Sequence, residues 1–198
     1  MQAKSTLKKY GIKSIESKYV STRKEALDFA GKDAIVLKLL SEKALHKTKA
    51  GLVKLNLKSD EISKAFDYLE TKGKQLKPYK IIAQKMANSG IEIIIGARVD
   101  KQFGKVLMIG LGGIYVETFK DVALRIVPIS DYDALSMVDQ LKSKNVITHN
   151  GSSTKMITEL LIKTSKMFAS DKKLTELDLN PIIIREKDYD VVDIRMIQ

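Results

Sequence analysis

A run of apolar segments between residues 79 and 129 constrains the fold of this chain more than any other feature. Each segment is short and rich in apolar residues, which is typical of β-strands. Little helical pattern separates the segments, so consecutive strands are expected to pair in an antiparallel or mixed sheet. The predicted strands cover residues 79–86, 91–99, 105–110, 114–119 and 124–129.

Helical periodicity follows this run. Two helices are predicted at about residues 131–144 and 153–170, and the second repeats apolar residues at the spacing of one helix face. That inner face contains Met156, Ile157, Leu160, Leu161, Thr164 and Phe168. Two closing strands, at residues 176–186 and 190–197, complete the predicted second lobe.

The first part of the chain predicts a β-α-β-β-α lobe after a short helix that ends near Tyr10. Thr22 and Glu25 have the spacing of a capping box, for a helix expected to stop at Gly31. A later helix is expected to stop at Gly73, and the strands cover residues 14–20, 34–40 and 52–57. The fold class is therefore α+β, with lobes at residues 1–80 and 81–198 and a ligand cleft expected between them.

Composition excludes several classes of protein. The 198 residues include no cysteine, which excludes a disulfide framework and a thiolate metal site. No run of about 18 apolar residues occurs, and the N-terminus lacks the apolar core of a signal peptide, so we expect a cytoplasmic protein without membrane segments. Lys and Arg outnumber Asp and Glu by 35 to 24, giving a net charge of +11. Such a charge attracts phosphates or nucleic acid, although dispersed lysines are more simply a solvated surface.

Lys38 is the first candidate binding residue, because it is a lone cation in an otherwise apolar predicted strand. It would either extend its ammonium from a strand edge to water or contact a phosphate oxygen. His46 is the second candidate, since a neutral imidazole can attack phosphorus and the adjacent Lys47 favours the neutral form. An ordinary exposed loop histidine is the alternative for His46, and also for His149.

Oxygen-bearing side chains near the C-terminus form a third candidate group. Asp178 and Asn180 are two residues apart on a predicted strand and face the same side, while Asp193 lies on the adjoining strand. Two carboxylates and an amide oxygen suit magnesium, which commonly retains waters and shares phosphate oxygens. A turn-capping role for Asn180 before Pro181 is the alternative. Further upstream, Gly110, Gly112 and Gly113 would permit close backbone approach to an anion or another chain, or form a tight turn.

Taken in order, these segments resemble the beta subunit of archaeal ADP-forming acyl-CoA (acetyl-CoA) synthetases, which is related to the beta subunit of succinyl-CoA synthetase. The resemblance extends over nearly the whole chain, from residue 8 to residue 197. Its most specific parts are LHK at 45–47 followed by GLVKLNLK, the segment at residues 100–130, and ELDLNPIII with VVDIRMI.

The resemblance implies an ATP-grasp fold that holds ATP or ADP with Mg²⁺ between two lobes. It implies the reaction acyl-CoA + ADP + phosphate to acid + CoA + ATP, carried out with a CoA-binding alpha subunit. His46 would relay the phosphoryl group to ADP. The residues that would bind the nucleotide are Lys38, Lys47, Gln84, Lys85, Met86 and Glu92. The residues that would bind the metal are Asn180, Asp193 and Asp178.

The sequence departs from the family pattern in several loops. Lys49 stands where an acidic residue is expected, Leu52 where a second glycine is expected, and Lys85 in place of glutamate. Asn150 replaces an expected arginine, and lysine or asparagine does not reproduce the bidentate phosphate contact of arginine. The alternatives to a catalytic subunit are therefore a degenerate ATP-grasp protein without turnover and a basic nucleic-acid-binding protein.

Overall fold

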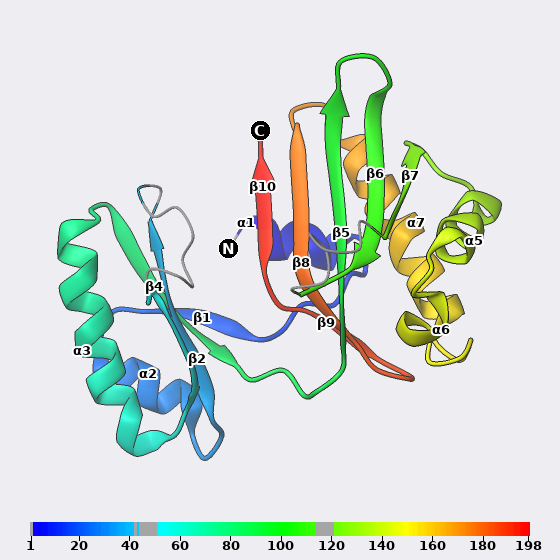
Figure 1. Cartoon of the computed structure of the whole chain (residues 1–198). Coiled ribbons are helices and arrows are strands. Elements are labelled where there is room, and N and C mark those ends of the chain that lie inside the picture. Colours follow the sequence, from blue (N-terminus) through cyan, green and yellow to red (C-terminus); the bar gives the residue numbers. More distant parts are fainter. Residues whose placement is uncertain (1, 42, 44–50, 114–120) are drawn as a thin grey trace. The chain divides into compact units, whose positions relative to one another are not determined.

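The computed structural model describes residues 2–41, 43, 51–113 and 121–198. The chain divides into two compact units, one formed by Ile15–Met86 and the other by Met1–Ser14 together with Ala87–Gln198 (Figure 1). The boundary was expected at residue 80 but lies after Met86. The reason is that strand β4 (Tyr79–Lys85) pairs with two strands of the Ile15–Met86 unit. The strand predicted at residues 114–119 lies outside the described residues.

The unit Ile15–Met86 contains a four-stranded antiparallel sheet in the order β1-β4-β2-β3. Its strands are β1 (Ser17–Val20), β2 (Ile35–Ser41), β3 (Val53–Leu57) and β4 (Tyr79–Lys85). Its helices are α2 (Arg23–Ala30) and α3 (Ser59–Gln75). Alternate residues of β2 and β4 pack with apolar residues of both helices in one core, so the helices cover one face of the sheet.

Capping and close packing determine the ends of these helices. The Thr22 hydroxyl accepts from the Glu25 amide at 3.1 Å, as predicted, but the Glu25 carboxylate accepts from Ser21. The prediction that Gly73 ends α3 is wrong, because the helix continues to Gln75. A Cβ at Gly73 would lie 2.5 Å from the Tyr79 ring, so the glycine is explained by close packing.

The other unit contains a six-stranded antiparallel sheet in the order β10-β8-β5-β6-β7, with β9 paired to β8. Its strands are β5 (Ile91–Asp100), β6 (Gly104–Leu111), β7 (Val122–Ile126), β8 (Glu176–Ile184), β9 (Tyr189–Val191) and β10 (Ile194–Ile197). Its helices are α1 (Gln2–Lys9), α5 (Asp131–Gln140), α6 (Lys144–Ile147) and α7 (Thr154–Ser170). The sheet is antiparallel, in agreement with the sequence-based expectation.

Helix α7 packs its predicted inner face into the core of this unit. Ile157, Leu160, Leu161, Thr164 and Phe168 are buried, and Met156 packs against the same core at partial burial. Leu7 and Ile12 belong to this core too, which explains why the first 14 residues form one unit with Ala87–Gln198. In the described part of the chain, no helix has the length and apolar character needed to cross a membrane.

The single helix predicted at residues 131–144 is interrupted, and Asp121 supplies the reason. The Asp121 carboxylate accepts hydrogen bonds from the backbone amides of Lys142 and Ser143, both at 2.8 Å, between α5 and α6. Burial raises the pKa of Asp121, but the Ser143 side chain, these two backbone hydrogen bonds and the Lys142 charge outweigh it and hold the pKa below its usual value of 3.8.

We expect Asp121→Ala to lower the free energy of unfolding by about 1–3 kcal/mol at neutral pH, because two amides would lose their acceptor. The folded-state pKa is below the unfolded one, so the carboxylate stabilises the fold above about pH 4 and loses this effect as the pH falls further. Urea unfolding of wild type and variant at pH 7 and pH 3 measures both effects. An equal difference at the two pH values would contradict this account.

Candidate functional site

Lys38 and Gln84 lie together on one face of the Ile15–Met86 sheet. Lys38 pairs with Ile82 across β2 and β4, and Gln84 pairs with Val36, so the two polar residues are diagonal neighbours. Their neighbours Leu37 and Ala83 belong to the core under the helices, so Lys38 and Gln84 face away from that core. Both are buried, with 9% and 3% of their surface exposed.

Lys85 lies on the opposite face of the same strand. Its ammonium donates to the Ala30 carbonyl at 3.1 Å and to the Asp33 carboxylate at 3.0 Å, and lies 5.4 Å from the Phe29 ring centre. The side chain therefore binds the C-terminal end of α2, where a cation is favourable. The structure does not bring it together with Lys38 and Gln84. Met86, the last residue of this unit, is partly exposed.

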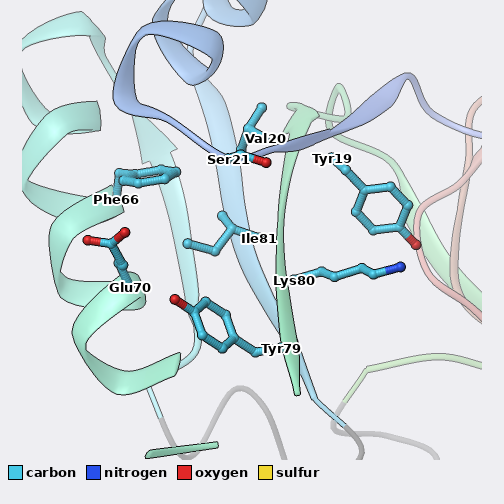
Figure 2. Close-up of a pocket in the computed structure, with 8 residues that line it drawn as sticks. All are labelled: Tyr19, Val20, Ser21, Phe66, Glu70, Tyr79, Lys80 and Ile81. Carbon is cyan, nitrogen blue, oxygen red and sulfur yellow. The ribbon is translucent and has the colours of Figure 1, made fainter. Parts of the chain in front are cut away.

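This unit also contains a hollow of about 380 Å³ that was not predicted from the sequence. Figure 2 shows Phe66, Glu70 and Tyr79 on one side of β4 and Tyr19 with Lys80 on the other. The Lys80 ammonium lies 5.1 Å from the Tyr19 ring centre. The residues lining the hollow are Tyr19, Val20, Ser21, Phe66, Glu70, Tyr79, Lys80 and Ile81. Of the residues predicted to bind nucleotide, those that the structure describes do not line it.

In the other unit, the predicted metal ligands Asp178 and Asn180 lie on β8, whereas Asp193, expected on the adjoining strand, lies just before β10. The backbone N–H of Asn180 donates to the backbone carbonyl of Asp193 at 3.2 Å, so these two residues lie side by side where β10 begins beside β8. Asp178 and Asn180 alternate with the buried Leu177 and Leu179, so their side chains leave the opposite face of β8.

The electrostatics of this group fit a cation. Burial raises the pKa of Asp178, the nearby Glu176 and Asp193 raise it further, and Arg195 opposes them. Repulsion between the carboxylates would be relieved by a divalent ion. Within the described ranges no three His, Asp or Glu side chains converge on a metal position. Two carboxylates and an amide nevertheless suit Mg²⁺, which shares its coordination with water and phosphate.

Glu92 of β5 packs against the glycine-rich turn after β6. The Gly112 amide donates to the Glu92 carbonyl at 2.7 Å, and a Cβ at Gly112 would lie 2.9 Å from the Glu92 backbone. Gly113 has φ +69° beside the Glu92 carboxylate. Gly110 is similarly close to β7, where a Cβ would lie 2.8 Å from Val122. Among the described contacts, these glycines permit close approach of segments of the same chain.

Of the two histidines, the structure describes only His149. His46 lies outside the described residues, as does Lys47. His149 is half-buried in the loop between α6 and α7, with its Nε2 3.5 Å from the Ile184 carbonyl. Its φ of 48° and that of Asn150, 55°, are in the left-handed region. The structure therefore places His149 in a tight connection beside β8.

Comparison with known proteins identifies the family of this chain. The model of the family described as ATP-grasp domain matches residues 1–197. The subunit beta of ADP-forming acetate–CoA ligase I from Pyrococcus furiosus is 34% identical, with 99% of this chain and 89% of that protein covered. The ADP-forming acetate–CoA ligase I of Archaeoglobus fulgidus is 34% identical, with 96% of this chain but 29% of that protein covered.

A solved structure shows the same similarity in three dimensions. It is the acetyl-coenzyme A synthetase 1 of Ca. Korarchaeum cryptofilum in complex with coenzyme A and Mg-AMPPCP, with a phosphohistidine segment pointing towards the nucleotide-binding site. The TM-score is 0.84 and the identity 33%, with 99% of this chain and 90% of that chain covered.

Proposed function

We propose, because this chain belongs to the ATP-grasp family, that it is the nucleotide-binding beta subunit of an ADP-forming acyl-CoA synthetase of the cytoplasm. The observation that carries the proposal is the 34% identity to a subunit beta of ADP-forming acetate–CoA ligase over 99% of this chain. The proposed overall reaction converts acyl-CoA, ADP and phosphate into the acid, CoA and ATP.

Phosphoryl transfer depends mainly on positioning and on positive charge near the transferred oxygens. Lys38 would supply such charge, and its position beside Gln84 on a face free of α2 and α3 is consistent with nucleotide binding. Lys47 would supply a second cation. Asn180, Asp193 and Asp178 would hold Mg²⁺, which when bound neutralises phosphate charge. Glu92 and the segment at residues 82–86 would contact the nucleoside.

His46 is the proposed phosphoryl carrier. Its neutral imidazole nitrogen would attack the phosphorus of a phosphohistidine on the companion alpha subunit, forming one P–N bond while the other breaks. A terminal phosphate oxygen of ADP would then attack the same phosphorus. The new P–O bond completes ATP as the His46 P–N bond breaks and the imidazole returns to its neutral form.

The proposal predicts that the isolated chain does not make ATP from acyl-CoA, ADP and phosphate, since the CoA chemistry belongs to the alpha subunit. Addition of that subunit should produce ATP at rates typical of enzymes, on the order of 1–10³ s⁻¹. A coupled luminescence assay with each subunit alone and both together measures this. Robust turnover by the single chain, or none by the mixture, would contradict the proposed division of labour.

A degenerate ATP-grasp protein that binds nucleotide without turnover is the second candidate. The specific observation in its favour is Lys85, which replaces the family glutamate and whose ammonium is engaged by Ala30 and Asp33. This candidate predicts nucleotide binding but no ATP synthesis with the companion subunit. Binding of nucleic acid would instead show as affinity that falls steeply with salt.

A further inference from the structure

Large apolar side chains are exposed along one edge of the six-stranded sheet. Leu124 and Ile126 of β7 are 53% and 58% exposed, and Phe103, at the turn between β5 and β6, is 60% exposed. Val122 of β7 is exposed as well. Contiguous apolar surface of this kind is uncommon on isolated soluble proteins and marks interaction sites.

Leu124, Ile126 and Phe103 are among the residues that line a hollow of about 560 Å³. The residues lining it are Arg98, Asp100, Phe103, Val106, Leu124, Arg125, Ile126 and Asp133. We call this set the β7 surface. Val106 pairs directly with Ile126, so the apolar part continues from β7 onto β6.

Strand β7 lies at an edge of its sheet, and the Arg125 guanidinium donates to its Leu124 carbonyl at 2.7 Å. In the described part of the chain β7 pairs with β6 alone, at the edge of the sheet (Figure 1). Arg125 turns towards α5, where its guanidinium donates to Ser136 at 2.8 Å and Gln140 at 3.2 Å. The side chains of Leu124 and Ile126 therefore lie on the opposite face of β7 from that of Arg125. An edge strand with an apolar outer face is a template for another protein surface.

The charges of the β7 surface are balanced, although the whole chain carries +11. Arg98 lies 3.8 Å from the Asp100 carboxylate, which also accepts from the amides of Gln102 and Phe103. The Asp133 carboxylate accepts from the Ser130 amide and hydroxyl, and Arg125 lowers the pKa of Asp133 further. A surface with paired charges around an apolar centre fits a protein partner and not a polyanion.

The β7 surface shares a sheet face with the proposed metal ligands. Asp178 pairs with Gly96, Gly96 with Met108, and Met108 with Leu124, so these residues form one row across four strands. Three strand spacings of about 4.8 Å place Asp178 and Leu124 roughly 14 Å apart. A partner seated on β7 would therefore lie close to Asp178 of the proposed metal ligands.

We propose that the β7 surface is the docking site for the CoA-binding alpha subunit, through an apolar surface of that subunit that covers Leu124, Ile126 and Phe103. This inference rests on the proposed function. The relatives support a companion as the occupant: one is a subunit beta, and in the Archaeoglobus ligase the matched part is 29% of a longer chain. In both arrangements the ATP-grasp part accompanies other protein.

Leu124→Glu and Ile126→Glu test the proposal, each in the full chain with the purified alpha subunit. A glutamate buried against an apolar surface is unfavourable, so we expect either variant to weaken binding of the alpha subunit by about 30-fold or more. Val146→Glu in α6 is the matched control, because Val146 is 55% exposed and lies outside the β7 surface. Isothermal titration calorimetry gives the dissociation constants, and thermal melting with Mg-ADP reports whether each variant remains folded and binds nucleotide.

The outcomes separate this inference from the proposed function. Selective loss of alpha-subunit binding in the two β7 variants, with melting and the Mg-ADP response retained, supports the docking site. Wild-type affinity in both variants overturns it while leaving the proposed function intact. A wild-type homodimer that Leu124→Glu dissociates without weakening alpha-subunit binding would assign the surface to a second copy and overturn it as well. If the wild type does not bind the alpha subunit at all, the proposed function itself fails.

Discussion

Replacement of His46 by alanine should abolish ATP synthesis by the reconstituted enzyme, with a loss of turnover of at least about a thousandfold. Removal of a covalent carrier leaves no route for the phosphoryl group, and losses of this order or larger accompany removal of catalytic nucleophiles. With the alpha subunit, acyl-CoA and labelled phosphate, the wild-type chain should acquire an acid-labile, base-stable label that ADP removes. His46→Ala should acquire none.

His149→Ala is the internal control for this experiment. His149 occupies a tight connection near the Ile184 carbonyl, and no transfer role is proposed for it. It should retain labelling and turnover. Label in His46→Ala that disappears in His149→Ala would reverse the assignment, and the absence of label in every background, with nucleotide binding intact, would favour the degenerate ATP-grasp protein.

Replacement of Asp193 by alanine should remove the magnesium-dependent part of the stabilisation by ADP. At a ligand concentration of roughly 100 times the dissociation constant, binding contributes about 2.7 kcal/mol to the folded state. Loss of one carboxylate leaves Asp178 and Asn180 as the remaining oxygen ligands, too few to hold Mg²⁺ well. Melting curves with ADP, with and without Mg²⁺, measure this contribution.

The Asp193 carboxylate also accepts from the Ile194 amide at 3.0 Å, so the variant is expected to lose some stability without any ligand. The relevant quantity is therefore the ligand-induced change and not the absolute melting temperature. Asp139→Ala is a suitable control, since Asp139 is exposed in the same unit and forms a surface ion pair with Lys144. An undiminished magnesium effect in Asp193→Ala would remove these residues from the proposed metal site.

The sheets and the long helices were predictable because their sequence patterns are typical of strands and helices. The strand around Lys38 is a short apolar run typical of a buried strand, much of the strand around Asp178 alternates, and α7 repeats its apolar residues at helical spacing, so local pattern and burial agree. The register that places Lys38 beside Gln84 was not predictable, because it depends on which strands pair.

Where the sequence was misread, a contact outside the local sequence pattern had determined the structure. Gly73 does not end α3 because its missing side chain makes room for Tyr79. The helix predicted at residues 131–144 breaks because Asp121 accepts from Lys142 and Ser143. The Lys85 side chain likewise turns towards the C-terminal end of α2, because its ammonium donates to the Ala30 carbonyl. No local pattern distinguishes such residues from ordinary ones.

The β7 surface was not predicted for a related reason. Leu124 and Ile126 belong to a segment with strand periodicity, and alternation alone does not tell whether the second face is covered. The position of β7 at the edge of the sheet decides this, and edge position depends on the order of all the strands.

Titration of the wild-type chain with Mg-ADP tests the central claim, nucleotide binding by this ATP-grasp protein, most directly. We expect saturable binding at one site, a rise in melting temperature that depends on both ADP and Mg²⁺, and little competition from oligonucleotides at physiological salt. A melting temperature unchanged at saturating Mg-ADP, together with no heat of binding, would contradict the account.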